Sequence, residues 1–206
     1  MNYTALSNAI QAYTENTEAD FVANIPVFVT QAEQRIFNSI QFPSLRQNVT
    51  GATTTNNKYL QCPTDFLAVY SLAIINASGE YEYLLNKDVN FIRQAYPQPT
   101  DTGIPRYYAL FGPRSDNAAE LTFILGPTPD AAYGAELHYF FYPPSITVSP
   151  YTSWLGDNFD SVLLYGSLVE AYTYMKGEQD MMALYNGKYQ EALALAKRLG
   201  DGMERQ

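Results

Sequence analysis

Histidine and cysteine are almost absent from this chain of 206 residues, which has one of each, His138 and Cys62. A single copy therefore cannot form an internal disulfide or a zinc site made from several Cys and His ligands. The absence of such sites excludes many common enzyme chemistries. We expect a protein whose function depends on its surfaces more than on a reactive group.

Charged residues are also scarce. They make up 16% of the chain, against 47% apolar residues, which is low for a monomer that keeps its whole surface in water. We therefore expect partners to cover part of the surface. Acids outnumber bases by 21 to 12, so the basic footprint of a nucleic-acid-binding protein is missing. An acidic surface does suit a conduit through which DNA passes without sticking, because like charges repel.

Signal-peptide and membrane-spanning patterns are missing as well. The start, Met1 to Thr4, lacks the basic and apolar regions of a signal peptide. The longest apolar run, near residues 66–75, is about half the ~20 residues that a membrane span needs. These patterns predict a soluble, intracellular protein without membrane contact.

Two apolar stripes with helical spacing lie near the N-terminus and predict two helices. The first contains Leu6, Ala9, Ile10 and Tyr13, and the second contains Phe21, Ile25, Phe28, Ala32, Ile36 and Ile40. Thr17 followed by Asp20 has the form of a capping box at the start of the second helix. Pro26 predicts a kink or a later start, because proline inside a helix removes a hydrogen bond.

Strand patterns replace helical ones from about residue 45 to residue 150. Gly and Pro punctuate this region, and Leu137, Tyr139 and Phe141 alternate with their neighbours, as in a strand with two unequal faces. A short helix near residues 87–96 interrupts the strands, because two prolines follow an apolar helical pattern. The middle of the chain is thus predicted to be a β domain.

Helical spacing returns after residue 151. Asp157 and Asp160 give an acidic first turn, Gly177 is expected to end this helix, Asp180 to cap the last one and Gly200 to stop it. The predicted fold class is α+β, with a four-helix bundle formed by the N- and C-terminal helices and an inserted antiparallel β domain. The predicted divisions are residues 1–44, 45–150 and 151–206.

Several polar side chains raise the question of chemistry. Asp157 and Asp160 resemble a metal loop but lack the ligand pattern of a calcium site, so a helix cap is favoured. Glu33 lies beside an apolar stripe and is either a buried acid or the partner of a base such as Arg46. Neither reading requires catalysis.

The two unique residues also have ordinary interpretations. A structural role is favoured for His138 over that of a general base, although Glu136 lies on the same strand face. A buried inert thiol is favoured for Cys62 over a nucleophile. A hydrolase site between subunits, made from Glu33, Asp65 or His138, remains an alternative. We predict no catalytic residue, no cofactor and no metal.

Paired aromatic residues mark candidate contact surfaces in the β region. We select Tyr107, Tyr108, Phe140 and Tyr142 as contacts with another subunit or another protein, because aromatic side chains favour interfaces. Few basic residues lie among them, so stacking on single-stranded bases is disfavoured. A carbohydrate-binding module that uses the tyrosine-rich β region is the alternative function.

Local motifs along nearly the whole chain resemble those of tailed-phage adaptor proteins. The segments that carry the resemblance are Ile25-Pro26-Val27-Phe28, Ala32-Glu33-Gln34-Arg35-Ile36, Pro63-Thr64-Asp65-Phe66, Gly103-Ile104-Pro105-Arg106-Tyr107-Tyr108, Leu125-Gly126-Pro127-Thr128-Pro129-Asp130, Trp154-Leu155 and Leu163-Leu164-Tyr165-Gly166-Ser167-Leu168-Val169-Glu170-Ala171. The adaptors in question are head-to-tail connectors related to the tubular tail gatekeepers of short-tailed phages.

The resemblance implies a structural role in the virion neck, after assembly in the host cytoplasm. It implies a homo-oligomeric ring, typically twelve-fold, that docks on the portal protein and attaches the tail or the next neck protein. Genomic DNA would pass through the ring without sequence-specific binding, and no enzyme activity or cofactor is implied. The implied portal contacts are Lys197, Arg198, Leu199, Met203, Glu204, Arg205 and Gln206.

Overall fold

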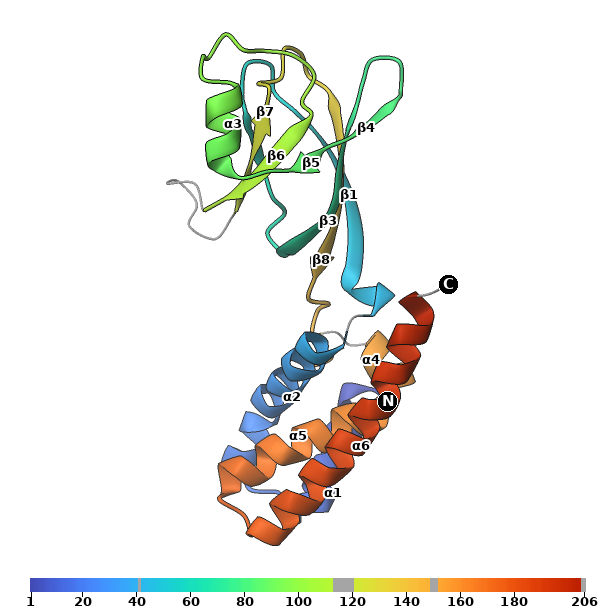
Figure 1. Cartoon of the computed structure of the whole chain (residues 1–206). Helices are drawn as coiled ribbons and strands as arrows, with labels where there is room; N and C mark the ends of the chain where they lie inside the picture. Colours follow the sequence, from blue (N-terminus) through green and yellow to red (C-terminus); the bar gives the residue numbers. More distant parts are fainter. Residues whose placement is uncertain (41, 113–120, 149–151, 205–206) are drawn as a thin grey trace. The chain divides into compact units, whose positions relative to one another are not determined.

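A computed structural model describes residues 1–40, 42–112, 121–148 and 152–204 (Figure 1). The chain divides into two compact units. A helical unit contains Met1–Leu45 and Tyr142–Gln206, and a β unit contains Arg46–Phe141. Helices and sheets are both present, so the predicted α+β class is confirmed. Residues 142–148, which the sequence assigns to the β region, belong to the helical unit.

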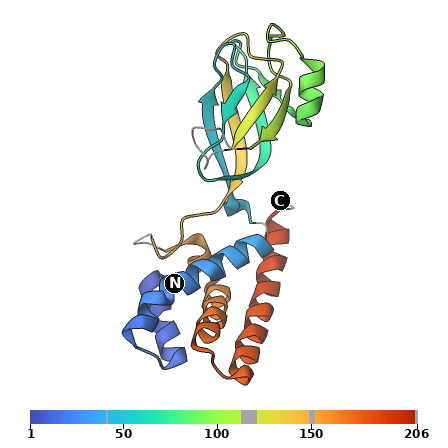
Figure 2. The ribbon, with the colours of Figure 1, turned by 90° about the vertical axis from the view of Figure 1, so that its left-hand side faces the viewer.

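The helical unit is organised around one central helix. Its elements are α1 (Tyr3–Thr14), α2 (Ala19–Ser39), the 3-10 turn η1 (Pro43–Leu45), α4 (Trp154–Asn158), α5 (Asp160–Met175) and α6 (Gln179–Glu204). Helix α5 contacts α1, α2, α4 and α6, and Figure 2 shows it between α1 and α6. Within the described ranges, no helix is both long enough and apolar enough to cross a membrane.

The apolar stripes of the two N-terminal helices face this core as predicted, except at Tyr13, which is exposed. The buried residues are Leu6 and Ile10 in α1, and Phe21, Ile25, Phe28, Val29, Ala32, Glu33 and Ile36 in α2. Asn2 starts α1, because its side chain accepts a hydrogen bond from the backbone N–H of Ala5 at 2.8 Å. The repeating apolar positions therefore locate both helices and their buried faces.

The start of α2 differs from the prediction. The capping box at Thr17 and Asp20 is wrong, because Glu18 occupies the cap position and makes no side-chain cap hydrogen bond. The backbone N–H of Glu18 instead donates to Asn16 Oδ1 at 3.0 Å. A late start at Pro26 is also wrong, since the helix begins at Ala19 and continues through the proline. Burial of the apolar stripe on both sides of Pro26 outweighs the missing hydrogen bond.

The ends of the C-terminal helices were predicted with mixed success. Ser153, not Asp157, caps α4, and its Oγ accepts the backbone N–H of Gly156 at 3.0 Å. Helix α5 ends at Met175, where Lys176 adopts a left-handed conformation. The expected stop at Gly200 is wrong, because α6 continues to Glu204. A single glycine lowers helix propensity by only about 1 kcal/mol, which a long helix tolerates.

The β unit contains two four-stranded sheets in the described part of the chain. The first sheet has the order β1 (Arg46–Ala52), β8 (Gly134–Phe141), β3 (Phe66–Ile75) and β4 (Tyr81–Tyr83). The second has the order β2 (Tyr59–Gln61), β7 (Thr122–Gly126), β6 (Tyr107–Phe111) and β5 (Leu85–Asn86). The short helix predicted near residues 87–96 is confirmed as α3 (Val89–Ala95), capped by Asp88.

One strand pair corrects the prediction of a wholly antiparallel β region. Strands β5 and β6 are parallel, with Leu85 opposite Tyr107. The connection between them contains α3, and a crossover of this kind returns the chain in the same direction. The other strand pairs of the two sheets are antiparallel.

The core of the β unit lies between the two sheets. Strand β8 contributes Ala135, Leu137 and Tyr139, whose burial confirms the predicted alternation of this strand. The facing aromatic residues pack edge to face, with ring centroids 5.6 Å apart for Phe66 and Phe123. Each unit therefore has an apolar core of its own.

Candidate interaction surfaces

The outer face of the first sheet carries a row of polar side chains. His138 Nε2 lies 3.0 Å from Glu136 Oε1, and His138 Nδ1 lies 3.4 Å from Ser71 Oγ. Tyr81 lies next to this row, and the negative charge of Glu136 raises the pKa of its hydroxyl. Both ring nitrogens of His138 thus have partners within the sheet, which supports the structural interpretation of this histidine.

An aromatic cluster lies on the same face, near the start of β1. The Arg46 guanidinium carbon lies 4.7 Å from the ring centroid of Tyr70 and 5.5 Å from that of Phe140. The two rings meet edge to face at 6.0 Å. Tyr70 is exposed. Arginine and tyrosine are enriched at the centres of protein interfaces, so the selected Phe140 belongs to a candidate contact surface.

The other three selected aromatic residues lie in different environments. Tyr108 is only 7% exposed and packs edge-on against Phe123, whereas Tyr107 is half-buried against Phe91 of α3. Tyr142 belongs to the helical unit, where its ring stacks on Phe37 and its hydroxyl donates to Asn38. The three residues of the β unit therefore lie in different environments, and Tyr108 has little surface to offer a partner.

The implied portal contacts lie on the last part of α6. Lys197, Arg198 and Leu199 are exposed. Met203 and Glu204 are the final residues of the helix, and the structure describes only their backbone. Arg205 and Gln206 lie outside the described residues. Exposed leucines continue along α6 at Leu184 and Leu195. Exposed apolar and charged side chains of both signs thus alternate along this helix, with two adjacent bases at Lys197 and Arg198.

Glu33 is a buried acid, as one sequence interpretation predicted. Its side chain is 3% exposed, and its Oε1 accepts the backbone N–H of Ile146 at 3.0 Å. Burial raises the pKa of this carboxyl, and hydrogen bonds from Ser145 and Ile146 partly offset the increase. The carboxylate thus holds the segment that follows β8 against α2.

Asp65 and the acids near α4 also have local partners. The hydroxyl of Tyr139 donates to Asp65 Oδ1 at 2.9 Å, and burial raises the pKa of that hydroxyl to about 12. Thr152 Oγ1 donates to Asp157 Oδ2 at 2.6 Å, and Asp160 is the first residue of α5. Within the ranges that the structure describes, no three His, Cys, Asp or Glu side chains form a group suited to a metal ion.

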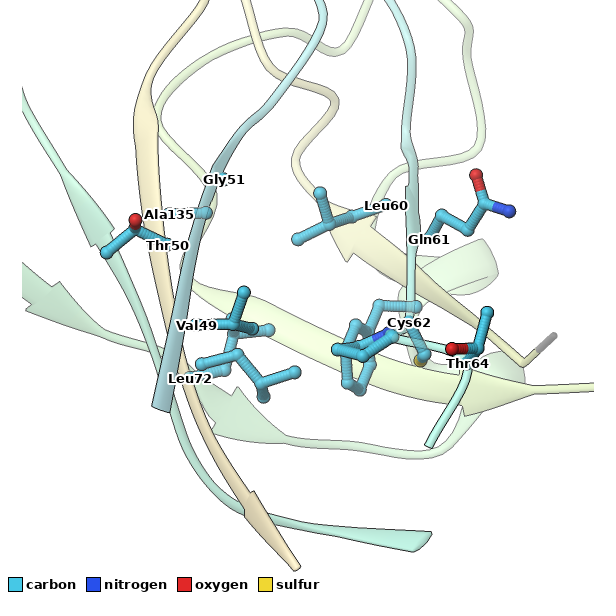
Figure 3. Close-up of a pocket in the computed structure, with 12 residues that line it drawn as sticks. Val49, Thr50, Gly51, Leu60, Gln61, Cys62, Thr64, Leu72 and Ala135 are labelled. Carbon is cyan, nitrogen blue, oxygen red and sulfur yellow. The ribbon is translucent and has the colours of Figure 1, made fainter. Parts of the chain in front are cut away.

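Cys62 lines an apolar cavity at one edge of the β unit. The cavity has a volume of about 420 Å³ and lies between β1 of the first sheet and the chain around β2 of the second (Figure 3). Burial raises the pKa of the Cys62 thiol to about 12, so very little thiolate is present at neutral pH. The thiol is therefore buried and unreactive, as predicted. The cavity itself was missed, because it depends on the pairing of distant strands.

Comparisons with known proteins give a family match and distant structural likenesses. A family model described as SU10 adaptor protein matches residues 1–206. A solved structure described as the neck of an empty GTA particle, computed with C6 symmetry, has 11% sequence identity and a TM-score of 0.28. That comparison covers 84% of this chain and 78% of the other. No curated protein matches the chain.

Proposed function

Since the chain belongs to the SU10 adaptor protein family, we propose that it works as a ring-forming adaptor that docks on the portal and attaches the tail or the next neck protein. The family match over residues 1–206 carries the proposal. It also confirms the resemblance to phage head-to-tail adaptors that the local motifs indicated. A twelve-fold ring, portal docking and a four-helix bundle around the DNA channel are finer parts of the proposal.

The composition supports an assembled state. Only 16% of residues are charged, and both units expose large apolar side chains, including Tyr83 in the β unit and Leu195 in the helical unit. A ring subunit covers two flanks with its neighbours, so such surfaces would be protected after assembly. The net charge of −9 suits a channel that DNA crosses without binding.

The proposed contacts follow from exposure and charge. We assign portal contact to the end of α6, where Lys197, Arg198 and Leu199 are exposed and where Met203 to Gln206 continue the chain. We assign contacts with a neighbouring subunit or the tail to Tyr107, Phe140 and Tyr142. Tyr108 is not assigned a direct contact, because its side chain is buried and supports the strand from within the core.

Catalysis is not part of the proposed function. Glu33, Asp65 and His138, the residues of the hydrolase alternative, each have a hydrogen-bond partner within their own unit. The carbohydrate-binding alternative needs accessible rings, yet Tyr139 is buried. Its support is the exposed tyrosines of the β unit, among them Tyr81 and Tyr83, whose stacked ring centroids lie 6.4 Å apart. A glycan array with the wild-type protein tests it, and we expect no binding.

A portal-binding measurement tests the proposed function. Sedimentation of the purified protein with and without the portal protein of the same phage should give a larger joint complex. Replacing Leu199 with Glu should weaken that complex at least tenfold, because it places a charge in the proposed apolar contact. Lys188→Glu, at an exposed position of the same helix far from its end, is the matched control. Unchanged sedimentation after mixing wild type with portal would argue against the adaptor role.

A further inference from the structure

Different edge strands border the two sides of the β unit. In the strand orders of the described sheets, β1 and β2 are the edge strands on one side, and β4 and β5 are the edge strands on the other. Only Leu84 separates β4 from β5 in the chain, so these two edges lie together. The β unit therefore has two opposite edges, each made from one strand of each sheet.

The edge formed by β1 and β2 contains a socket. The cavity of about 420 Å³ opens between these strands, and Val49, Leu60, Cys62, Leu72, Phe123 and Leu137 line it (Figure 3). Its volume falls within the range of about 300–1,000 Å³ that is typical of ligand pockets, so it has room for large side chains. In the described sheets β1 pairs with β8 alone, which leaves its other edge open for backbone hydrogen bonds.

The edge formed by β4 and β5 carries a projection. Tyr83 is 68% exposed and Leu85 is 60% exposed, and both lie at the border of the two sheets. Stacking of Tyr81 on Tyr83 holds the second ring in a defined orientation. These exposed apolar side chains lie close together, so a partner that covered them would remove apolar surface from water.

The charges of the two edges are complementary. Residues 46–64, which contain β1 and β2, include Arg46 and Lys58 but no acid. Residues 80–88, which contain β4 and β5, include Glu80, Glu82 and Asp88 against one base, Lys87. A slightly basic socket side and an acidic projecting side attract each other and disfavour contacts between identical edges.

From these observations we propose that the β4–β5 edge of one copy inserts Tyr83 and Leu85 into the socket between β1 and β2 of the next copy. A contact between two different edges is heterologous, and repeated contacts of this kind close into a ring when the rotation between copies allows it. The inference rests on the proposed function, because it names the subunit contact of the ring. The occupant of the socket is a second copy of this chain.

Two positions at the ends of the proposed contact provide a direct test. Gly51 lines the socket and is exposed, and a Cβ there would meet no heavy atom within 4 Å. Cys62 is replaced by alanine, because burial raises the pKa of its thiol to about 12 and makes it unreactive. In that background, the pair Gly51→Cys and Leu85→Cys should form a disulfide between neighbouring copies when assembled rings are treated with copper–phenanthroline and dioxygen. The oxidant removes two electrons and two protons from each pair of thiols.

The expected result is a ladder of covalent oligomers on a non-reducing gel. Three control variants in the same background should give no ladder. Gly51→Cys combined with Tyr70→Cys places the second thiol on the outer sheet face. Gly51→Cys alone and Leu85→Cys alone each lack the partner thiol.

The outcomes separate this inference from the proposed function. If the double-cysteine variant forms rings as wild type does and gives no ladder in them, the socket contact is overturned while the adaptor role stands. A small molecule that fills the socket, detected by native mass spectrometry of purified rings, would also overturn it. Monomers that persist in the presence of portal would overturn the contact and the adaptor role together.

Discussion

The two units use aromatic residues in opposite ways. In the helical unit, Phe42, Trp154 and Phe159 pack against one another, with ring centroids between 4.7 Å and 5.3 Å apart. In the β unit, Tyr83 and its neighbour Tyr81 stack on each other but remain exposed at a sheet edge. The first cluster completes a core within one chain, whereas the second offers apolar surface to a partner.

This difference separates stability from assembly. The helical unit buries even a carboxylate, Glu33, and gives it hydrogen-bond partners. The β unit leaves a cavity at one edge and projecting side chains at the other. We therefore expect substitutions in the helical cluster to lower the free energy of unfolding, and substitutions at the β edges to change association.

The largest expected effect comes from Phe42→Ala. Phe42 is fully buried between Trp154 and Phe159, so its truncation leaves a cavity and should lower the free energy of unfolding by about 3–5 kcal/mol. Hydrogen exchange followed by mass spectrometry should show faster exchange in α4 and α5. Equal acceleration in β3 and β8 would contradict the separation of the two cores.

A second prediction concerns the contact of α5 with its neighbours. A Cβ on Gly166 would lie 3.2 Å from Ala32 Cβ and 3.2 Å from the Tyr189 ring. Gly166→Val should therefore lower the free energy of unfolding by about 1–3 kcal/mol through overpacking. Gly187→Ala is the matched change, because its Cβ would meet open space. Chemical denaturation of Gly187→Ala should show a gain of about 1 kcal/mol in the free energy of unfolding. A loss would mean that another part of the protein covers α6 at this position.

A third prediction uses pH. Burial raises the pKa of Glu33 above its ordinary value of 4.5. The stability that protonation of Glu33 contributes is therefore fully present below pH 4.5, and it is lost as the pH rises through the pKa of the folded state. Glu33→Gln keeps an acceptor for the Ile146 N–H but cannot ionise. The variant should gain stability relative to wild type as the pH rises above 4.5. Parallel stability curves in thermal melts at several pH values would refute the role given to burial.

The smallest expected effect on stability comes from Tyr83→Ser. Its ring is mostly exposed, so the free energy of unfolding should change by less than about 0.5 kcal/mol. Tyr70→Ser, at another exposed position, should behave alike in the melt. Only Tyr83→Ser should weaken ring formation in analytical ultracentrifugation. Loss of stability without loss of assembly would place Tyr83 in the core and remove the contrast between the units.

Periodic patterns in the sequence predicted much of the fold. The stripe from Phe21 to Ile36 and the alternation around Leu137 were right, because repeated burial of one face leaves a regular pattern. Helix ends were less predictable, since they depend on single hydrogen bonds such as the one between Glu18 and Asn16. The parallel pairing of β5 with β6 depends on tertiary contacts that no local pattern contains.

The candidate surfaces were only partly predictable. Tyr107 and Tyr108 are adjacent on a strand, so their side chains point to opposite faces, and alternation alone could have excluded one of them. The structure shows that Tyr108 is the buried one. The socket could not be predicted, because Val49 and Leu60 come together only when two different sheets pack face to face.

Electron cryomicroscopy of the purified protein mixed with the portal of the same phage tests the central claim most directly. We predict a closed ring of copies seated on the portal, with an open channel along its axis and with β units that touch through unlike edges. A protein that stays monomeric, or whose copies never join the portal, would contradict the account.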